Sequence, residues 1–285
     1  YGPTKEISEK LLKEFNINAH FYNPNSFDDL KNKVNKKTKM ILVENPGSNT
    51  FEFQDLSKIV SLAKRKKILT LLDNTWGTPL YLKPLQIGFD MSFSSATKYF
   101  SGHSDAMGGS LAVNKKVFNK VMFFYKLSGY RMSADEAYLI IRGLRTLDVR
   151  LKKHYENTKI IINFLRKQKK IKEILYPYKP SSKSYKLWKK YYSGANGLFS
   201  IVVKSKKRSS VIKFVNSLEL FGIGYSWGGF ESLVLLQDLR TNTKYTQTRR
   251  FLRFAKDEHI VRLHIGLEDP KDLIIDLKRS LKHIK

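Results

Sequence analysis

Cysteine is absent from the 285 residues of the chain. Its absence excludes disulfide bonds, zinc sites built from thiolates and catalysis by a thiol, and it suits a cytoplasmic protein. Long apolar runs are also missing: the longest are about half of a membrane span, so the sequence predicts no transmembrane helix and no membrane partner. The first residues, Tyr1 to Thr4, contain neither an initiator Met nor the basic and apolar parts of a signal peptide. We therefore expect the chain to be a fragment or to have lost an upstream segment.

Acidic residues are scarce, because 25 Asp and Glu stand against 53 Lys and Arg, which gives a formal net charge of +28. Such a balance is typical of nucleic-acid-binding proteins, so a basic binding module is one alternative function. However, the basic residues are scattered, with short runs only at 64–67, 169–170 and 206–208. No helix-turn-helix, zinc finger or RNA-recognition motif accompanies them. We therefore expect solvated basic surfaces and no nucleic-acid partner.

Apolar residues make up 41% of the chain, which at this length is enough for a large core and for two domains. In the first half, apolar runs at 40–43, 68–72 and 91–94 have the character of buried strands. A helix that begins at Asp55, its expected N-cap, separates the first two runs. This alternation predicts an α/β fold in which helices cover a mostly parallel sheet.

The second half predicts a smaller α+β domain. Residues 133–170 are mostly helical with a break near Gly143, where we place the boundary between domains 1–144 and 145–285. An apolar run at 198–203 predicts a strand, and the run at 260–266 alternates as an edge strand would. The last helix is expected to begin after Asp269.

Two polar residues follow strands of the predicted parallel sheet. Asp73 comes directly after the strand at 68–72, and Lys98 follows the strand at 91–94. Open parallel sheets bind ligands outside the carboxyl ends of their strands, so these two side chains make a candidate site. Each alone is weak evidence, since an Asp and a Lys in ordinary loops are the simpler alternative. The residues around Lys98 strengthen the case.

The sequence Ser95-Ala96-Thr97-Lys98, preceded by Asp73, resembles the pyridoxal-phosphate enzymes of the cystathionine lyase and synthase family. The resemblance implies an aspartate-aminotransferase-like fold (fold type I) and pyridoxal 5'-phosphate as cofactor. It also implies roles: Lys98 bonds to the cofactor aldehyde and then carries protons, while Asp73 faces the pyridine nitrogen. Ser95 and Thr97 are expected to donate hydrogen bonds to the phosphate.

Two further motifs extend the resemblance into the second half. The stretch 225–233, YSWGGFESL, is similar to the family's Ser-x-Gly-Gly-x-Glu-Ser loop, and a Trp in its variable slot is typical of the β-lyases. The stretch 262–269, RLHIGLED, also has the β-lyase form. The resemblance implies that Arg262, Ser226 and Trp227 bind the substrate, with Arg262 holding its α-carboxylate through a planar fork. Without the motif, a surface strand residue would be the simpler interpretation of Arg262, and a core aromatic that of Trp227.

A Gly-His-Ser-Asp sequence at 102–105 also matches the family. We assign His103 to a turn or to packing rather than to general-base catalysis, because no partner carboxylate is evident. The family carries a further upstream segment with a glycine-containing phosphate loop, which precedes the position of Tyr1. Tyr1 itself falls where the family has the tyrosine that stacks on the cofactor ring, so the resemblance gives it a catalytic and cofactor-binding role.

The function implied by the resemblance is β-elimination of L-cystathionine to homocysteine, pyruvate and ammonia in methionine biosynthesis. The substrate class is a small sulfur amino acid, and the implied assembly is a homo-oligomer built as a dimer of dimers. Two alternatives stay open beside it. One is an enzyme of the γ-lyase or γ-synthase type, and the other is a truncated remnant that catalyses nothing.

Overall fold

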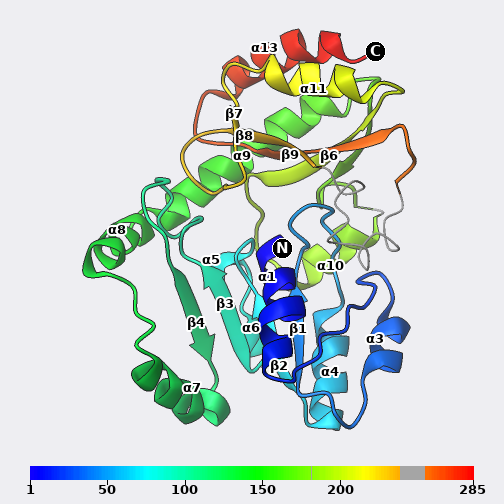
Figure 1. Cartoon of the computed structure of the whole chain (residues 1–285). Helices are drawn as coiled ribbons and strands as arrows, with labels where there is room; N and C mark the ends of the chain where they lie inside the picture. The colour runs from blue at the N-terminus through cyan, green and yellow to red at the C-terminus, as the bar shows by residue number, and fades with distance from the viewer. Residues whose placement is uncertain (181, 238–253) are drawn as a thin grey trace.

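The computed structural model describes residues 1–180, 182–237 and 254–285. Within these residues the strands form two sheets, which lie one above the other in Figure 1. The first sheet has the order β1-β2-β3-β4. Its strands are β1 (Met40–Glu44), β2 (Leu69–Asp73), β3 (Met91–Ser95) and β4 (Gly109–Val113). The first three strands are parallel and β4 is antiparallel to β3, so the expected parallel sheet is confirmed.

Helices flank the first sheet. The helix α4 covers it with an apolar face that includes Leu56 and Ile59, and the Asp55 carboxylate accepts a hydrogen bond from Lys58 N, as expected of an N-cap. The N-terminal helix α1 begins near the carboxyl end of β1, where the Tyr1 amine lies 2.5 Å from Glu44 Oε2. The helices of this part are α1 (Gly2–Glu6), η1 (Ile7–Leu11), α2 (Leu12–Glu14), α3 (Phe27–Lys33), α4 (Leu56–Lys66), α5 (Thr78–Tyr81), α6 (Pro84–Ile87), α7 (Lys115–Ser128) and α8 (Ala134–Leu144).

The second sheet has the order β5-β6-β9-β8-β7 among the described residues. Its strands are β5 (Ile171–Leu175), β6 (Leu198–Lys204), β7 (Gly222–Ile223), β8 (Leu233–Gln237) and β9 (Glu258–His264). The expectation that residues 260–266 form an edge strand is wrong, because β9 pairs with β6 on one side and β8 on the other. Every residue of β9 is buried, since both faces of a central strand are covered.

The helices of the second half pack on this sheet and join it to the first. They are α9 (Leu147–Leu165), α10 (Lys183–Tyr191), α11 (Arg208–Asn216), α13 (Pro270–Ser280) and η3 (Leu281–His283). The helix α8 ends at Leu144 and α9 begins at Leu147, so the expected helix break lies two residues beyond Gly143. The boundary between residues 144 and 145 coincides with this connection, and the division into two domains stays a prediction.

Gly143 lies within α8 and permits a close contact instead of ending the helix. A Cβ on this residue would be 2.1 Å from Ser101 O and 2.3 Å from Phe100 O. The helix therefore touches the backbone of the segment that follows Lys98, and only a glycine fits at this point.

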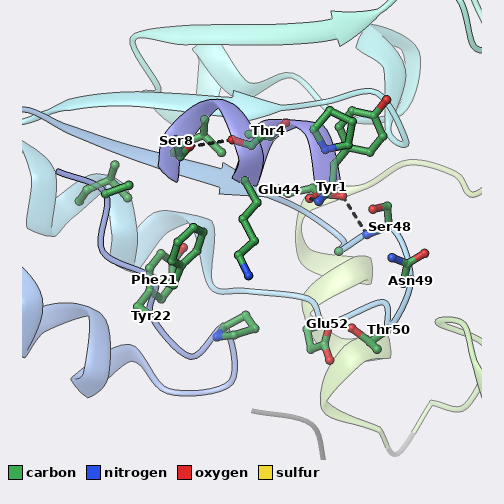
Figure 2. Close-up of a pocket in the computed structure, with 18 of the residues that line it drawn as sticks. Tyr1, Thr4, Ser8, Phe21, Tyr22, Glu44, Ser48, Asn49, Thr50 and Glu52 are labelled. Atoms are coloured by element: carbon green, nitrogen blue, oxygen red, sulfur yellow. Dashed lines mark hydrogen bonds and ion pairs between the residues drawn. The ribbon is translucent and has the colours of Figure 1, made fainter. Parts of the chain in front are cut away.

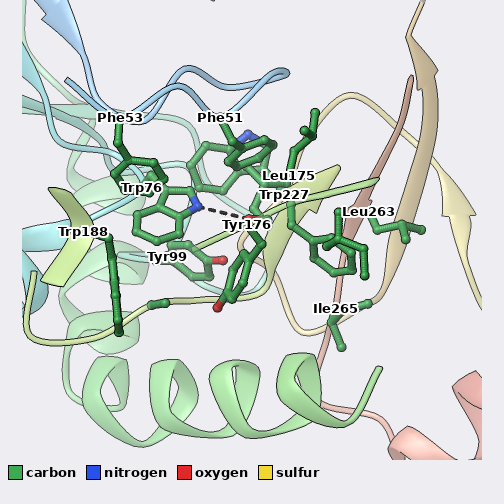
Figure 3. Close-up of a cluster of buried hydrophobic side chains, with 14 of the residues drawn as sticks. Phe51, Phe53, Trp76, Tyr99, Leu175, Tyr176, Trp188, Trp227, Leu263 and Ile265 are labelled. Atoms are coloured by element: carbon green, nitrogen blue, oxygen red, sulfur yellow. Dashed lines mark hydrogen bonds between the residues drawn. The ribbon is translucent and has the colours of Figure 1, made fainter. Parts of the chain in front are cut away.

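An aromatic cluster fills the space between the two sheets (Figure 3). Trp76, which follows β2, packs edge-on against Phe53 and Tyr192, and its indole N–H donates to Leu198 O over 3.1 Å. Tyr176, after β5, contacts Trp76 and Phe199. Buried aromatic pairs of this kind contribute about 0.5–1.5 kcal/mol each beyond their buried area. The cluster fixes how the second sheet sits on the first, and so where its side chains meet the ends of β2 and β3.

In the described ranges, no helix has the length and apolar character that crossing a membrane requires.

Candidate active site

A large open cleft of about 2150 Å³ runs along β1, from the segment before Met40 to the carboxyl end of the strand, and continues to the turn after β3. Figure 2 shows part of its wall, where Tyr1 and Glu44 face the loop that carries Ser48 and Asn49. Other segments of the wall come from the turn after β3 and from the second sheet. The predicted site residues that line the cleft are Tyr1, Thr97, Lys98, Ser226 and Arg262.

Lys98 extends from the turn after β3 toward the second sheet. Its Nζ donates a hydrogen bond of 2.8 Å to Ser226 Oγ and lies 5.6 Å from the centroid of the Trp227 ring. Burial, and next the positive charge of Arg262, lower the pKa of Lys98 to about 8. The amine is therefore easier to deprotonate than an ordinary lysine, as a nucleophile or base requires.

Asp73 lies at the end of β2, in register with Glu44 on β1. Burial is the main cause that raises the pKa of Asp73, and the neighbouring Glu44 carboxylate raises it further. Thr75 opposes this shift, because its backbone N and its Oγ1 donate to Asp73 Oδ1 over 2.9 and 2.5 Å. Thr75 Oγ1 also accepts from Ser95 N over 2.9 Å, so one threonine joins the ends of β2 and β3. The sequence reasoning missed Thr75, although a hydroxyl two residues after an Asp is a common turn signal.

Ser95 ends β3, and Thr97 lies with Lys98 in the turn that follows. Thr97 Oγ1 accepts a hydrogen bond from Gly108 N over 2.9 Å and donates to Gly108 O over 3.4 Å. This hydroxyl holds the turn after β3 closed while it lines the cleft. Ser95 is half-buried at the end of β3 and is not part of the cleft wall.

Arg262 projects from the centre of the second sheet into the cleft. Its Nη2 donates to Tyr225 O over 2.6 Å and its Nη1 to Asn49 Oδ1 over 3.4 Å. Its cross-strand neighbour Ser200 donates to Asn49 O over 2.8 Å, so Asn49 is held at two points. Burial lowers the pKa of Arg262 to about 10. Within the described ranges Arg262 forms no ion pair, which leaves a buried cation suited to an incoming carboxylate.

Asn49 was also missed by the sequence reasoning, because its partners lie 151 and 213 residues away. A local sequence pattern cannot indicate contacts between residues that are so far apart in the chain.

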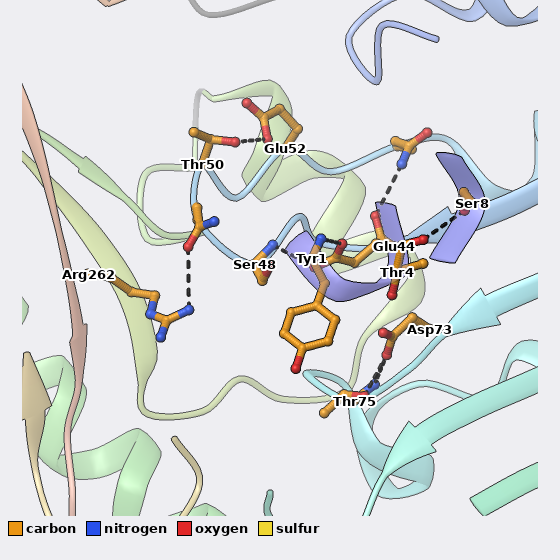
Figure 4. Close-up of polar contacts among 12 residues, drawn as sticks. Tyr1, Thr4, Ser8, Glu44, Ser48, Thr50, Glu52, Asp73, Thr75 and Arg262 are labelled. Carbon is orange, nitrogen blue, oxygen red and sulfur yellow. Dashed lines mark hydrogen bonds and ion pairs between the residues drawn. The ribbon is translucent and has the colours of Figure 1, made fainter. Parts of the chain in front are cut away.

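Tyr1 points into the cleft between Arg262 on one side and Asp73 with Thr75 on the other (Figure 4). Its backbone amine lies 2.5 Å from Glu44 Oε2, and Glu44 Oε1 accepts from Ser48 N over 2.8 Å. The residue is 59% exposed, so much of its surface is open to the cleft and to solvent.

Trp227 and His103 differ from the other candidates. Trp227 is buried and packs edge-on against Tyr99, with a centroid distance of 5.5 Å, so it supports Lys98 from below rather than lining the cleft. His103 is exposed, and its Nδ1 lies 2.6 Å from Ser101 O. That contact within the turn agrees with the structural assignment of His103.

The donor set fits pyridoxal phosphate. The Lys98 amine is partly desolvated, and the half-buried Asp73 carboxylate has Thr75 as its hydrogen-bonding partner and forms no ion pair within the described ranges. A protonated pyridine nitrogen would pair with this carboxylate, and an aldehyde would meet the amine. Arg262 stands opposite them as a site for a carboxylate.

The comparison with protein families matches residues 1–282 to the Cys/Met metabolism PLP-dependent enzymes. The chain belongs to this family. Its cofactor is therefore pyridoxal phosphate, and it is an enzyme of this class. The family resemblance seen in the sequence is confirmed.

Several relatives of known name are similar over nearly the whole chain. A cystathionine beta-lyase of Bordetella avium is 36% identical over 282 residues, which are 99% of this chain and 69% of that protein. An L-alanine/L-glutamate racemase of Wolbachia pipientis is also 36% identical, covering 100% of this chain and 69% of that protein. A solved structure of cystathionine gamma-lyase from Lactobacillus plantarum, complexed with L-serine, superimposes with a TM-score of 0.90 at 27% identity. It covers 100% of this chain and 74% of that one, and it confirms the expected fold class.

Proposed function

We propose that the protein is a carbon–sulfur lyase that cleaves L-cystathionine by β-elimination. With one water, the products are homocysteine, pyruvate and ammonia. Pyridoxal phosphate supplies an electron sink that makes the substrate α-proton acidic. Similarity to the cystathionine beta-lyase of Bordetella avium supports the choice of substrate and reaction.

Residues of the chain bind the substrate, transfer the proton and hold the cofactor. Arg262 binds the substrate carboxylate through its fork, and this contact fixes the position of the α-carbon. Lys98 takes the α-proton, which its lowered pKa makes possible near neutral pH, and Ser226 orients the amine beforehand. We assign Asp73 to the pyridine nitrogen, Ser95 and Thr97 to the phosphate, and Tyr1 to the face of the ring. Trp227 keeps water from the amine.

One observation carries the proposal: the partly desolvated Lys98 amine and the buried Arg262 guanidinium, which forms no ion pair within the described ranges, line one cleft, and the Asp73 carboxylate lies at the neighbouring strand end. For an amino-acid substrate, the amine serves covalent capture, the carboxylate serves activation and the guanidinium serves orientation.

The test is product analysis with purified protein supplied with pyridoxal phosphate. We expect a yellow protein that forms pyruvate and homocysteine in equal amounts from L-cystathionine. Cysteine and 2-oxobutyrate in their place would instead establish the γ-lyase alternative. A chain that takes up no cofactor and forms no product would establish the truncated remnant.

Amino-acid racemisation is a second candidate function, favoured by the similarity to the Wolbachia pipientis racemase. It requires proton exchange at the α-carbon from both faces. Lys98 serves one face, and the exposed phenol of Tyr1 projects into the cleft from another element. Chiral chromatography after incubation with L-alanine decides this case, because a racemase forms D-alanine without pyruvate.

We further propose that the protein acts in the cytoplasm as a homo-oligomer. Exposed apolar side chains gather on α7 and α8, which is unusual for the surface of a monomer. The most exposed of them are Phe123, Phe124, Leu127 and Tyr138. Light scattering after size-exclusion chromatography tests the assembly, and a monomer at micromolar concentration would contradict it.

A further inference from the structure

The loop that carries Ser226 lies directly on the segment that carries Lys98, and two glycines make the contact possible. A Cβ on Gly228, whose φ is +87°, would be 2.8 Å from Tyr99 N. A Cβ on Gly229 would be 2.2 Å from Ser104 Oγ. The two segments therefore approach to backbone contact, and larger residues would separate them.

Two hydrogen bonds hold the loop in this place. Gly228 N donates to Nε2 of the buried His264 over 3.1 Å, so this bond attaches the loop to β9. At the other end, Ser104 Oγ donates to Glu231 Oε1 over 2.6 Å. Ser104 and Glu231 belong to the two motifs, 102–105 and 225–233, and the proposed chemistry has no direct use for either residue.

The Ser104–Glu231 bond has two unusual partners. Ser104 has φ of +58°, a left-handed conformation that is uncommon for residues other than Gly, Asn and Asp. Glu231 Oε2 is buried and finds no hydrogen-bond donor among the described residues. Ser104 is thus the donor that satisfies this carboxylate in the described part of the chain, and backbone strain at such a point is typical of functional sites.

We propose that Ser104 and Glu231 form a latch that positions Ser226 and Trp227 against Lys98. The pair acts through the loop and is not catalytic. Without the Ser104 hydroxyl, the Glu231 carboxylate has no donor and turns toward water, which draws the loop away from Lys98. Lys98 then gains contact with solvent, which raises its proton affinity more than the loss of the Ser226 acceptor lowers it, since burial is the main cause of its lowered pKa. Of the charged groups around the amine, Arg262 acts on it directly, whereas His264 is held neutral by burial.

The latch rests on the proposed function, but its test measures a property of the Lys98 amine and does not need lyase activity. The proton affinity of Lys98 is measured in the full chain, freed of cofactor, from the pH dependence of its reductive methylation by peptide mass spectrometry. Ser104→Gly removes the hydroxyl and suits the left-handed backbone, so it is expected to fold at least as well as the wild type. Ser193→Ala is the matched control, since this exposed serine donates to Leu80 O outside the cleft.

In Ser104→Gly we expect about a tenfold rise in the proton affinity of Lys98, so that its methylation at pH 8 slows about fivefold. Glu231→Gln, which keeps an acceptor oxygen for Ser104, is expected to stay within about twofold of the wild type. A Ser104→Gly protein with unchanged Lys98 titration, or an equal change in Ser193→Ala, would overturn the latch. Absence of lyase activity in the wild type would overturn the proposed function and leave this result intact.

Discussion

Glu44 and Asp73 are register partners at the carboxyl ends of β1 and β2, which brings the Asp73 carboxylate near that of Glu44, a residue of the cleft wall. The pKa of Asp73 is raised by burial and by Glu44, so the folded state binds its proton more tightly than the unfolded state does. The charged form therefore lowers stability. This cost is fully present above the folded pKa and disappears as the pH falls below the unfolded pKa.

We therefore predict that Asp73→Asn stabilises the cofactor-free protein at pH 7 while it destroys activity. Each kcal/mol gained would raise Tm by about 2–4 °C in a chain of this size. Lyase activity is expected to fall at least about 10²-fold, because the pyridine nitrogen loses its charged partner. Melting curves between pH 4 and 8 check the first part, and the difference from wild type should shrink on acidification. A lower Tm for the variant at pH 7 would contradict it.

The depressed pKa of Lys98 predicts selective chemistry in the cofactor-free protein. At pH 8 about half of the Lys98 side chains are neutral, against roughly 0.3% of lysines with the ordinary pKa of 10.5. Reductive methylation at low reagent concentration should therefore label Lys98 before the exposed lysines, such as Lys152. Peptide mass spectrometry measures the order of labelling. Lys98→Ala should abolish turnover, and a Lys98 that is labelled no faster than Lys152 would refute the pKa argument.

We predict that substitutions of Arg262 and Asn49 weaken substrate binding to different degrees. Arg262→Lys keeps the charge but loses the planar fork, so KM for L-cystathionine should rise about 10–100-fold. Asn49→Ala releases one side of the guanidinium, whose contact is long at 3.4 Å, and we expect KM to rise about threefold with kcat nearly unchanged. Thr50→Val on the same loop serves as control, since its hydroxyl contacts Glu52 and not Arg262. Equal KM values for Arg262→Lys and wild type would exclude the carboxylate role.

The sequence was sufficient where the signal is local. The apolar run at 40–43 and the N-caps Asp55 and Asp269 all predicted elements that the structure contains. The expected burial of the run at 40–43 is wrong for one face, since Met40 and Leu42 are exposed. The sequence was not sufficient where contacts between distant segments determine the place of an element in the fold. The alternation at 260–266 is that of an edge strand, yet β9 is central because β8, nearby in sequence, and β6, far from it, both pair with it.

The same limit applies to the site. Thr75, Asn49 and the Ser104–Glu231 bond act through partners that the fold brings from other strands, and the last pair is separated by 127 residues. A glycine can likewise signal a helix end or a close contact, and only the neighbouring backbone distinguishes the two.

Gly143 provides a test of that distinction. In an exposed helix interior, Gly→Ala stabilises by about 1 kcal/mol, because Ala has the higher helix propensity. At Gly143 the new Cβ would be 2.1 Å from Ser101 O, a backbone atom that cannot move without displacing the turn that carries Lys98. We therefore predict that Gly143→Ala destabilises the protein by about 1–3 kcal/mol and lowers kcat. Gly224→Ala is the control, since its Cβ would meet its nearest neighbour, Leu233, at an ordinary 3.6 Å. Urea unfolding and initial rates of both variants decide the matter, and a Gly143→Ala protein more stable than wild type would show that α8 does not rest on the Lys98 turn.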